Sequence, residues 1–200
     1  MYFRFKGGED FVFRGCEFKS DKPFNKEAAN DAFKKCKKEI LDVFLAENGF
    51  YKWKTAMYVR LDESGLLQVV ELEKSRFDSI AFWVTFRVQP LYIPNLDRIW
   101  GINDRLGYCI YGRGDIRWYY ADYETAKTSF ENIRDGIKIY LLPWFDEFCA
   151  EENFRKRLME KGPSKWLKAL ERSEEERKAA MLDNIERLKL PKKLAQKVLA

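Results

Sequence analysis

The most chemically suggestive polar residues lie in one short run, residues 69–76. If this run is a β-strand, alternation places Glu71, Glu73 and Ser75 on one face. Two carboxylates two residues apart could act there as a general acid and a general base. Glutamates without a catalytic role are far more common on the open face of an antiparallel strand than such a pair, however. We therefore favour this interpretation. The other polar members of the run are Lys74 and Arg76.

A second hypothesis for this run is the active site of a restriction-type nuclease. Such a site needs a carboxylate and a lysine on the same face of a strand. Glu73 and Lys74 are adjacent in the sequence, so alternation points them to opposite faces. The spacing therefore counts against a nuclease.

Histidine is absent from the 200 residues. Its absence excludes Ser-His-Asp and Cys-His catalysis, the common zinc sites and any histidine-based pH switch. The four cysteines, Cys16, Cys36, Cys109 and Cys149, are far apart and form no Cys-x-x-Cys pair. This pattern indicates buried thiols in a reducing compartment. With no signal peptide or membrane span in the sequence, we predict a cytoplasmic protein without a metal or cofactor.

Aromatic residues are in surplus, at 16% of the chain, and some alternate with basic ones, as in residues 51–54 and 117–120. Such interleaving is compatible with stacking on single-stranded nucleic acid, although core packing explains most of these rings more simply. The net charge of +5 is diffuse, and the lysines of residues 34–38 are expected on a solvated helix face. Nucleic acid is therefore a disfavoured partner. The aromatic residues left over as candidates for a binding surface are Trp53, Trp83 and Trp100.

The first third of the chain predicts a hairpin in residues 1–20 and a long helix after it. Asn25 is the expected N-cap, and Asn48-Gly49 is a strong stop signal because both residues tolerate a left-handed backbone. Helical spacing predicts a buried face made of Ala29, Phe33, Cys36, Ile40, Val43 and Phe44.

Strands are predicted at residues 50–61, 66–74 and 79–89, and the first two are joined by a turn at residues 62–65. Residues 90–114 are irregular, and a short strand near 115–120 precedes a second long helix capped by Asp122. Pro143 is expected to kink or break this helix. Its predicted inward stripe is Ala126, Phe130, Ile133, Ile137, Leu141, Trp144 and Phe148.

The last fifty residues predict short helices with too little apolar surface to fold alone. Ser173 and Glu176 have the spacing of a capping box, and Pro191 suits the first turn of a final helix. We therefore predict an α+β fold, with a mostly antiparallel sheet packed by two long helices and a C-terminal helical extension. The expected division is an α+β domain at 1–152 and the extension at 153–200.

From Phe33 to about Phe148, the order of features resembles a bacterial family, domain of unknown function 4304. The segments that carry the resemblance are residues 47–50, 58–60, 69–76, 82–86 and 142–145. The chain departs from the family pattern in having Glu73 where glutamine is usual. The resemblance implies a small cytosolic α+β protein, in a family sometimes regarded as immunity or partner-binding modules. The residues that correspond to the family's motif are Glu73, Lys74, Ser75 and Arg76, and the resemblance implies no role for them.

The leading functional hypothesis is a non-enzymatic bacterial module that binds another protein through a sheet face and the 90–114 loop. An immunity factor is one form of this hypothesis, although a net charge of +5 does not favour a nuclease toxin as the target. Two alternatives stay open: a histidine-free enzyme that uses a carboxylate pair, and a weak binder of single-stranded nucleic acid. The sequence leaves the partner and the oligomeric state open.

Overall fold

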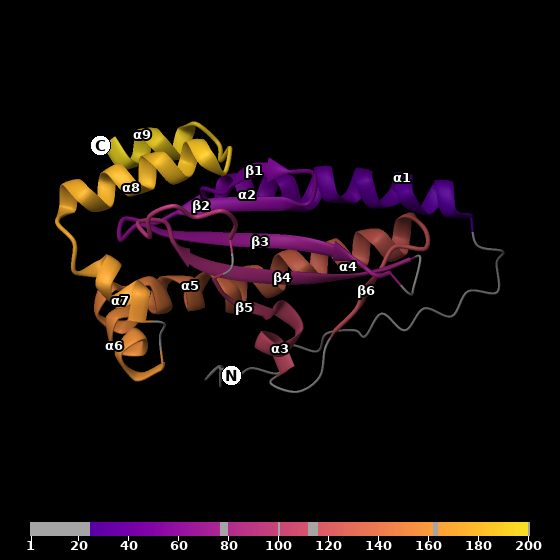
Figure 1. Ribbon diagram of the computed structural model, residues 1–200. Helices are drawn as coiled ribbons and strands as arrows, with labels where there is room; N and C mark the ends of the chain where they lie inside the picture. The colour runs from indigo at the N-terminus through magenta and orange to yellow at the C-terminus, as the bar shows by residue number, and fades with distance from the viewer. Residues whose placement is uncertain (1–24, 77–79, 100, 112–115, 162–163, 200) are drawn as a thin grey trace. The chain divides into compact units, whose positions relative to one another are not determined.

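The computed structural model describes residues 25–76, 80–99, 101–111, 116–161 and 164–199 (Figure 1). The predicted hairpin at residues 1–20, Cys16 and Trp100 lie outside these residues. The chain divides into two compact units, each built from separate segments of the sequence. The first unit comprises Met1–Phe50, Glu71–Thr85 and Asp104–Leu142, and the second comprises Tyr51–Val70, Phe86–Asn103 and Pro143–Ala200.

An antiparallel sheet and helices make up the fold, which confirms the predicted α+β class with its C-terminal helical extension. The strands are hydrogen-bonded in the order β1-β2-β3-β4-β5, and β6 pairs with β4. Because β3 and β4 are long, each contributes residues to both units. The strands are β1 (Tyr51–Lys54), β2 (Met57–Leu61), β3 (Leu66–Lys74), β4 (Ala81–Pro90), β5 (Ile102–Arg105) and β6 (Trp118–Tyr119).

Residues 50–61 form a tight hairpin, so the prediction of one strand was wrong. Tyr51 pairs with Val59 and Lys52 with Tyr58, and the register shifts between Lys52 and Lys54. Period-two alternation continues on both sides of the short turn, which hides the reversal from a pattern search. The predicted turn at residues 62–65 does join β2 to β3, and Gly65 takes a φ of 82° there.

The first long helix begins where the sequence predicts, because the Asn25 side chain accepts the backbone N–H groups of Glu27 and Ala28 at 3.0 and 3.1 Å. It then continues as α1 (Lys26–Cys36), a π-helical segment η1 (Lys37–Asp42) and α2 (Val43–Glu47). Asn48 and Gly49 end it as expected.

The π-helical segment shifts the buried face of this helix by one residue. A π-helix has more residues per turn than an α-helix, so the face that follows it is rotated. Leu41 and Leu45 are therefore fully buried, whereas Val43, predicted to face inward, is 50% exposed. Lys37, expected on a solvated face, is only 6% exposed and pairs with Asp42 at 2.8 Å.

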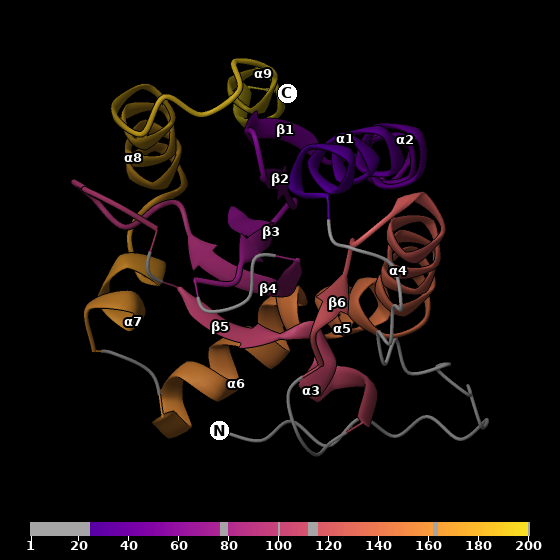
Figure 2. The same cartoon turned by 90° about the vertical axis from the view of Figure 1, so that its right-hand side faces the viewer.

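The second long helix packs against the first within the same unit, with α4 beside α1 (Figures 1 and 2). Asp122 caps α4 (Tyr123–Gly136) by accepting the Thr125 backbone N–H at 2.8 Å. All seven residues of the predicted stripe are buried. Phe33 of α1 contacts the rings of Phe82, Tyr120 and Phe130 at centroid distances of 4.8–5.2 Å, which forms the aromatic core of this unit.

Pro143 does not break the helix, so this alternative of the prediction was wrong. The chain stays helical through η2 (Ile137–Leu141) and α5 (Leu142–Cys149). The predicted short strand before α4 is β6, and part of the segment predicted as irregular forms β5 and α3 (Leu106–Tyr111).

The second unit contains the C-terminal helices α6 (Glu151–Lys161), α7 (Ser164–Leu170), α8 (Glu174–Arg187) and α9 (Lys193–Leu199). Ser173 and Glu176 form the predicted capping box at the start of α8. Helices α8 and α9 lie side by side (Figures 1 and 2). A row of stacked and edge-on rings joins the helices of this unit, and its members are Phe86, Trp144, Phe148, Phe154 and Trp166.

Candidate functional site

The predicted polar run lies at the end of β3 in the first unit. Glu73 is half-buried and accepts the Thr85 hydroxyl at 3.2 Å, so its carboxylate takes part in a contact between β3 and β4. Glu71 is also half-buried, and Leu72 between the two glutamates is buried on the other face. Ser75 donates its backbone N–H to Ala81 at 2.8 Å, and Arg76 is exposed. This run is therefore largely engaged in the pairing of two strands.

Trp53 and Trp83, the two tryptophan candidates within the described residues, each contact basic side chains. Trp53, in the second unit, donates its indole N–H to the Lys189 carbonyl at 3.0 Å, and the Lys54 ammonium lies 4.2 Å from its ring centroid. Trp83, in the first unit, is half-buried, with the guanidinium groups of Arg105 and Arg117 at 4.8 and 5.5 Å from its ring.

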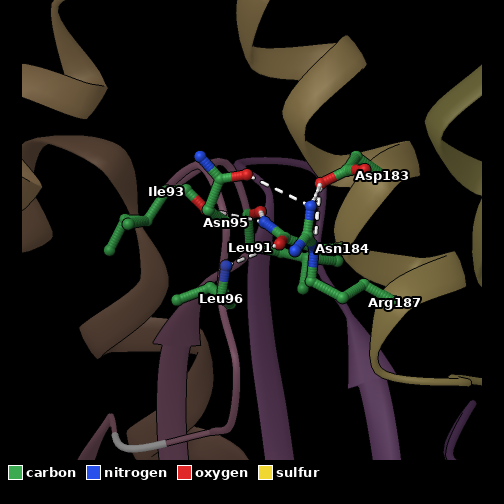
Figure 3. Close-up of polar contacts among 7 residues, drawn as sticks. All are labelled: Leu91, Ile93, Asn95, Leu96, Asp183, Asn184 and Arg187. Carbon is green, nitrogen blue, oxygen red and sulfur yellow. Dashed lines mark hydrogen bonds and ion pairs between the residues drawn. The ribbon is translucent and has the colours of Figure 1, made fainter.

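The irregular segment after β4 is held firmly by α8 (Figure 3). The side-chain amide of Asn184 donates to the carbonyls of Leu91 and Ile93 at 2.7 and 2.6 Å, and its oxygen accepts the Leu96 N–H at 2.9 Å. Arg187 donates to the Asn95 side chain at 3.1 Å. Residues 91–96 are thus fixed inside the second unit, and most of them are buried.

The second unit contains a large open pocket, which we call the Arg60 pocket. Its volume is about 1050 Å³. Strand β2, the β2–β3 turn, β3, α5, α8 and α9 all contribute to its lining. The lining includes Arg60, Leu61, Asp62, Ser64, Gln68, Asp146, Cys149, Glu174, Lys178, Met181, Lys197 and Val198.

Hydrogen bonds within the β2–β3 turn organise one wall of the Arg60 pocket. Asp62 accepts the Ser64 hydroxyl at 2.9 Å and the Leu66 backbone N–H at 2.7 Å. The Ser64 hydroxyl also lies 3.3 Å from the carbonyl oxygen of Cys149, which ties the turn to α5. An aspartate at the first position of a turn commonly accepts such bonds, so this wall is a local consequence of the sequence Asp-Glu-Ser-Gly.

A second set of contacts runs from Cys149 to the pocket mouth. The buried amide of Gln68 donates to the Cys149 sulfur at 3.3 Å, and its oxygen accepts Arg60 Nε at 2.6 Å. Arg60 also lies 3.5 Å from the Asp146 carboxylate, whose side chain is 74% exposed. The guanidinium group thus binds a buried partner, Gln68, and an exposed one, Asp146.

Burial raises the pKa of two groups in the pocket, Cys149 and Asp62. Burial, followed by the nearby charge of Asp62, raises the pKa of the Cys149 thiol to about 12. Burial likewise raises the pKa of Asp62, although the bonds from Leu66 and Ser64 act in the opposite direction. At neutral pH Cys149 is therefore a thiol rather than the thiolate that nucleophilic catalysis needs.

Charges of both signs and apolar side chains surround the mouth of the pocket. Lys178 pairs with Glu174 at 3.0 Å, and Lys197 donates to the Leu61 carbonyl at 3.4 Å. The apolar lining includes Leu61, Met181 and Val198. This arrangement is suited to non-covalent recognition of a ligand that carries charge and apolar surface together.

The Arg60 pocket was missed from the sequence. One usable signal was Gln68, a polar residue in the otherwise apolar run of residues 66–70, because a buried polar side chain needs a specific partner. Its partners Arg60 and Cys149 lie 8 and 81 residues away, a separation that no local pattern reveals.

Comparisons with known proteins leave the family open. No protein-family model, curated protein or solved structure matches the chain. The resemblance to the family of unknown function therefore stays a prediction. Within the described ranges, no three acidic or cysteine side chains are grouped to hold a metal ion. No helix in the same ranges has the length and apolar character needed to cross a membrane.

Proposed function

We propose that the protein is a non-catalytic binding module and that the Arg60 pocket receives a segment of a partner protein. The observation that carries the proposal is the combination of a large open pocket with a protonated thiol and with charges of both signs at its mouth. We prefer the pocket to residues 91–96 of the predicted 90–114 loop, because Asn184 already binds the backbone groups of Leu91, Ile93 and Leu96. Binding through the sheet face stays a prediction.

The character of the lining favours a polypeptide over a small substrate. Arg60, Lys178 and Lys197 come from three different elements. Two acidic residues of the lining also form ion pairs, Asp146 with Arg60 and Glu174 with Lys178. A polypeptide segment offers carboxylates, ammonium groups and apolar side chains at the spacings that such a mixed surface matches. Arg60 is the expected anchor, since a carboxylate of the partner can take the place of Asp146, whose side chain is exposed.

Site-specific photo-cross-linking in the native host tests the proposal. A photoreactive amino acid replaces Glu174, at the pocket mouth, and in a matched control it replaces Met159 of α6, which is 70% exposed and does not line the pocket. We expect one protein to be cross-linked from position 174 and not from position 159. Equal products from both positions, or none from position 174, would contradict the proposal.

The purified cross-linked partner permits a quantitative second step. Arg60→Ala should raise the Kd for that partner about tenfold or more, which is the range of a central arginine in an interface. Arg172→Ala, a change of equal charge outside the pocket lining, is the control and should leave the Kd within about twofold. The identity of the partner also tests the narrower hypothesis of an immunity factor.

A further inference from the structure

Three residues of α1 form a row on one face of the helix in the first unit. Lys26, Asn30 and Lys34 follow one another at intervals of four residues, and side chains spaced in this way lie one turn apart. Lys74, at the end of β3, meets the middle of the row, because its Nζ donates to Asn30 Oδ1 at 2.9 Å. We call this group the Lys74 cluster.

An aromatic base fixes the position of the Lys74 ammonium. Its Nζ lies 4.4 Å from the ring centroid of Phe33 and 4.7 Å from that of Tyr120. Both rings are buried and contact each other at 4.8 Å. The ammonium is thus held in place by rigid partners, and its remaining hydrogens can donate to a ligand.

Positive charge in the Lys74 cluster is only partly neutralised. Burial, and then the charges of Lys34 and Lys26, lower the pKa of Lys74. Asp31 pairs with Lys34 at 3.1 Å, but both side chains are largely exposed and such a pair is weak. Among the residues that the structure describes, no carboxylate forms an ion pair with Lys26 or Lys74.

We propose that the Lys74 cluster binds a phosphate group, either as free phosphate or as the phosphate of a larger ligand. A phosphate monoester carries between one and two negative charges at neutral pH and three strong acceptor oxygens. That matches three ammonium groups better than a single carboxylate does. Asn30 adds an amide that can donate to the same anion. This site lies in the first unit and does not depend on the function proposed for the Arg60 pocket.

Titration of the full chain with inorganic phosphate tests the site, with sodium chloride at matched ionic strength as the reference. The readout is the NMR signal of lysine Cε atoms in protein labelled with 13C-lysine, and the Lys74 signal is assigned from its loss in Lys74→Gln. We expect phosphate to shift the Lys74, Lys34 and Lys26 signals along one saturable curve. Phenyl phosphate, a monoester, represents a phosphate group carried by a larger ligand and should give the same pattern of shifts.

Two variants of equal charge separate a site from general attraction. Lys74→Gln should weaken phosphate binding about tenfold, which corresponds to roughly 1.4 kcal/mol. Lys35→Gln removes a lysine from the same helix, one that lies over the Tyr123 ring at 4.8 Å, and should change the affinity less than about twofold.

Equal losses in the two variants would overturn the proposal, as would shifts of all lysines that grow without saturation. If Lys74→Gln fails to fold, Lys34→Gln replaces it, because the Lys34 side chain is 74% exposed and its loss should not affect folding. That variant should weaken binding several-fold, and an unchanged affinity would count against the site.

Discussion

Asn184 Oδ1 accepts the backbone N–H of Leu96 at 2.9 Å, although 88 residues separate the two in the sequence. The Asn184 side chain is fully buried, and its amide nitrogen donates to two further backbone carbonyls of the same segment (Figure 3). One side chain of α8 thus satisfies three polar groups of a segment without regular structure. Within the second unit, α8 and residues 91–96 are held together by these bonds.

Replacing Asn184 by alanine should be strongly destabilising. Three buried backbone groups would lose their partner, and each such loss costs about 1–3 kcal/mol. We expect Asn184→Ala to lower the free energy of unfolding by about 3 kcal/mol or more, measured by denaturant unfolding. Arg187→Ala is the control. It removes an exposed contact to Asn95 and should cost at most about 1 kcal/mol. Similar losses in both variants would contradict the assigned role.

Two substitutions at Asp62 should differ in their effect on the free energy of unfolding. Asp62→Asn keeps an oxygen that can accept from Ser64 and Leu66, and it removes a carboxylate whose charge is disfavoured by burial. At neutral pH it should leave the free energy of unfolding unchanged or raise it. Asp62→Ala loses both bonds and should lower it by about 1–3 kcal/mol.

The effect of pH provides a further check on Asp62. Its pKa in the folded protein is raised from 3.8, so the stability that the group contributes is present below that value and is lost as pH rises through the folded pKa. The advantage of Asp62→Asn over the wild type should therefore grow as the pH is raised from acid. A constant difference between the two proteins across this range would show that burial does not raise the pKa.

Cys149 should make the protein less stable at high pH. Its pKa is raised from 9.0 to about 12 on folding, so the unfolded chain loses this proton first. The stabilising contribution is complete below 9.0 and is lost as pH rises from there towards 12. Compared with Cys149→Ser, which has no thiol, wild type should lose about 2 kcal/mol of additional stability by about pH 10.5. Parallel stability curves for the two proteins would contradict this prediction.

The rotated face of the first helix can be tested by a pair of truncations. Leu45 is fully buried, whereas Val43 is 50% exposed. Helical spacing from Ala29 predicts that Val43 is buried. Leu45→Ala should cost about 2–5 kcal/mol because it leaves a cavity. Val43→Ala should change the free energy of unfolding by no more than about 0.5 kcal/mol. Comparable losses at both positions would argue for an unbroken α-helix.

Features set by neighbouring residues could be predicted from the sequence. The caps at Asn25, Asp122 and Ser173 each depend on a side chain that reaches a backbone group two or three residues away. The buried stripe of the second long helix, which spans α4, η2 and α5, and the long strands follow periodicities of 3.6 and two residues in the same way. These local preferences were enough to predict the α+β class.

Features that depend on distant partners could not be predicted. The Arg60 pocket requires β2, α5, α8 and α9 to meet, and its central contact joins Gln68 to Cys149 across 81 residues. The anchoring of residues 91–96 requires Asn184, which on its own is one polar residue in an amphipathic helix. The hairpin at residues 51–61 was missed because both of its strands keep the same alternation through the turn.

The Lys37–Asp42 ion pair marks the π-helical segment, where the helix contains one residue more than an α-helical turn would hold. Residues five apart do not meet on an α-helix, which brings together side chains three or four apart, so the pair is compatible only with the wider turn. Deleting one residue between positions 38 and 41 would convert the segment to a regular α-helix. Leu45 would then occupy the helical position that the spacing predicts for Phe44, and it would still face the core. The fold should tolerate a shortened chain here better than anywhere within α1, where a deletion would turn the whole apolar face away from α4.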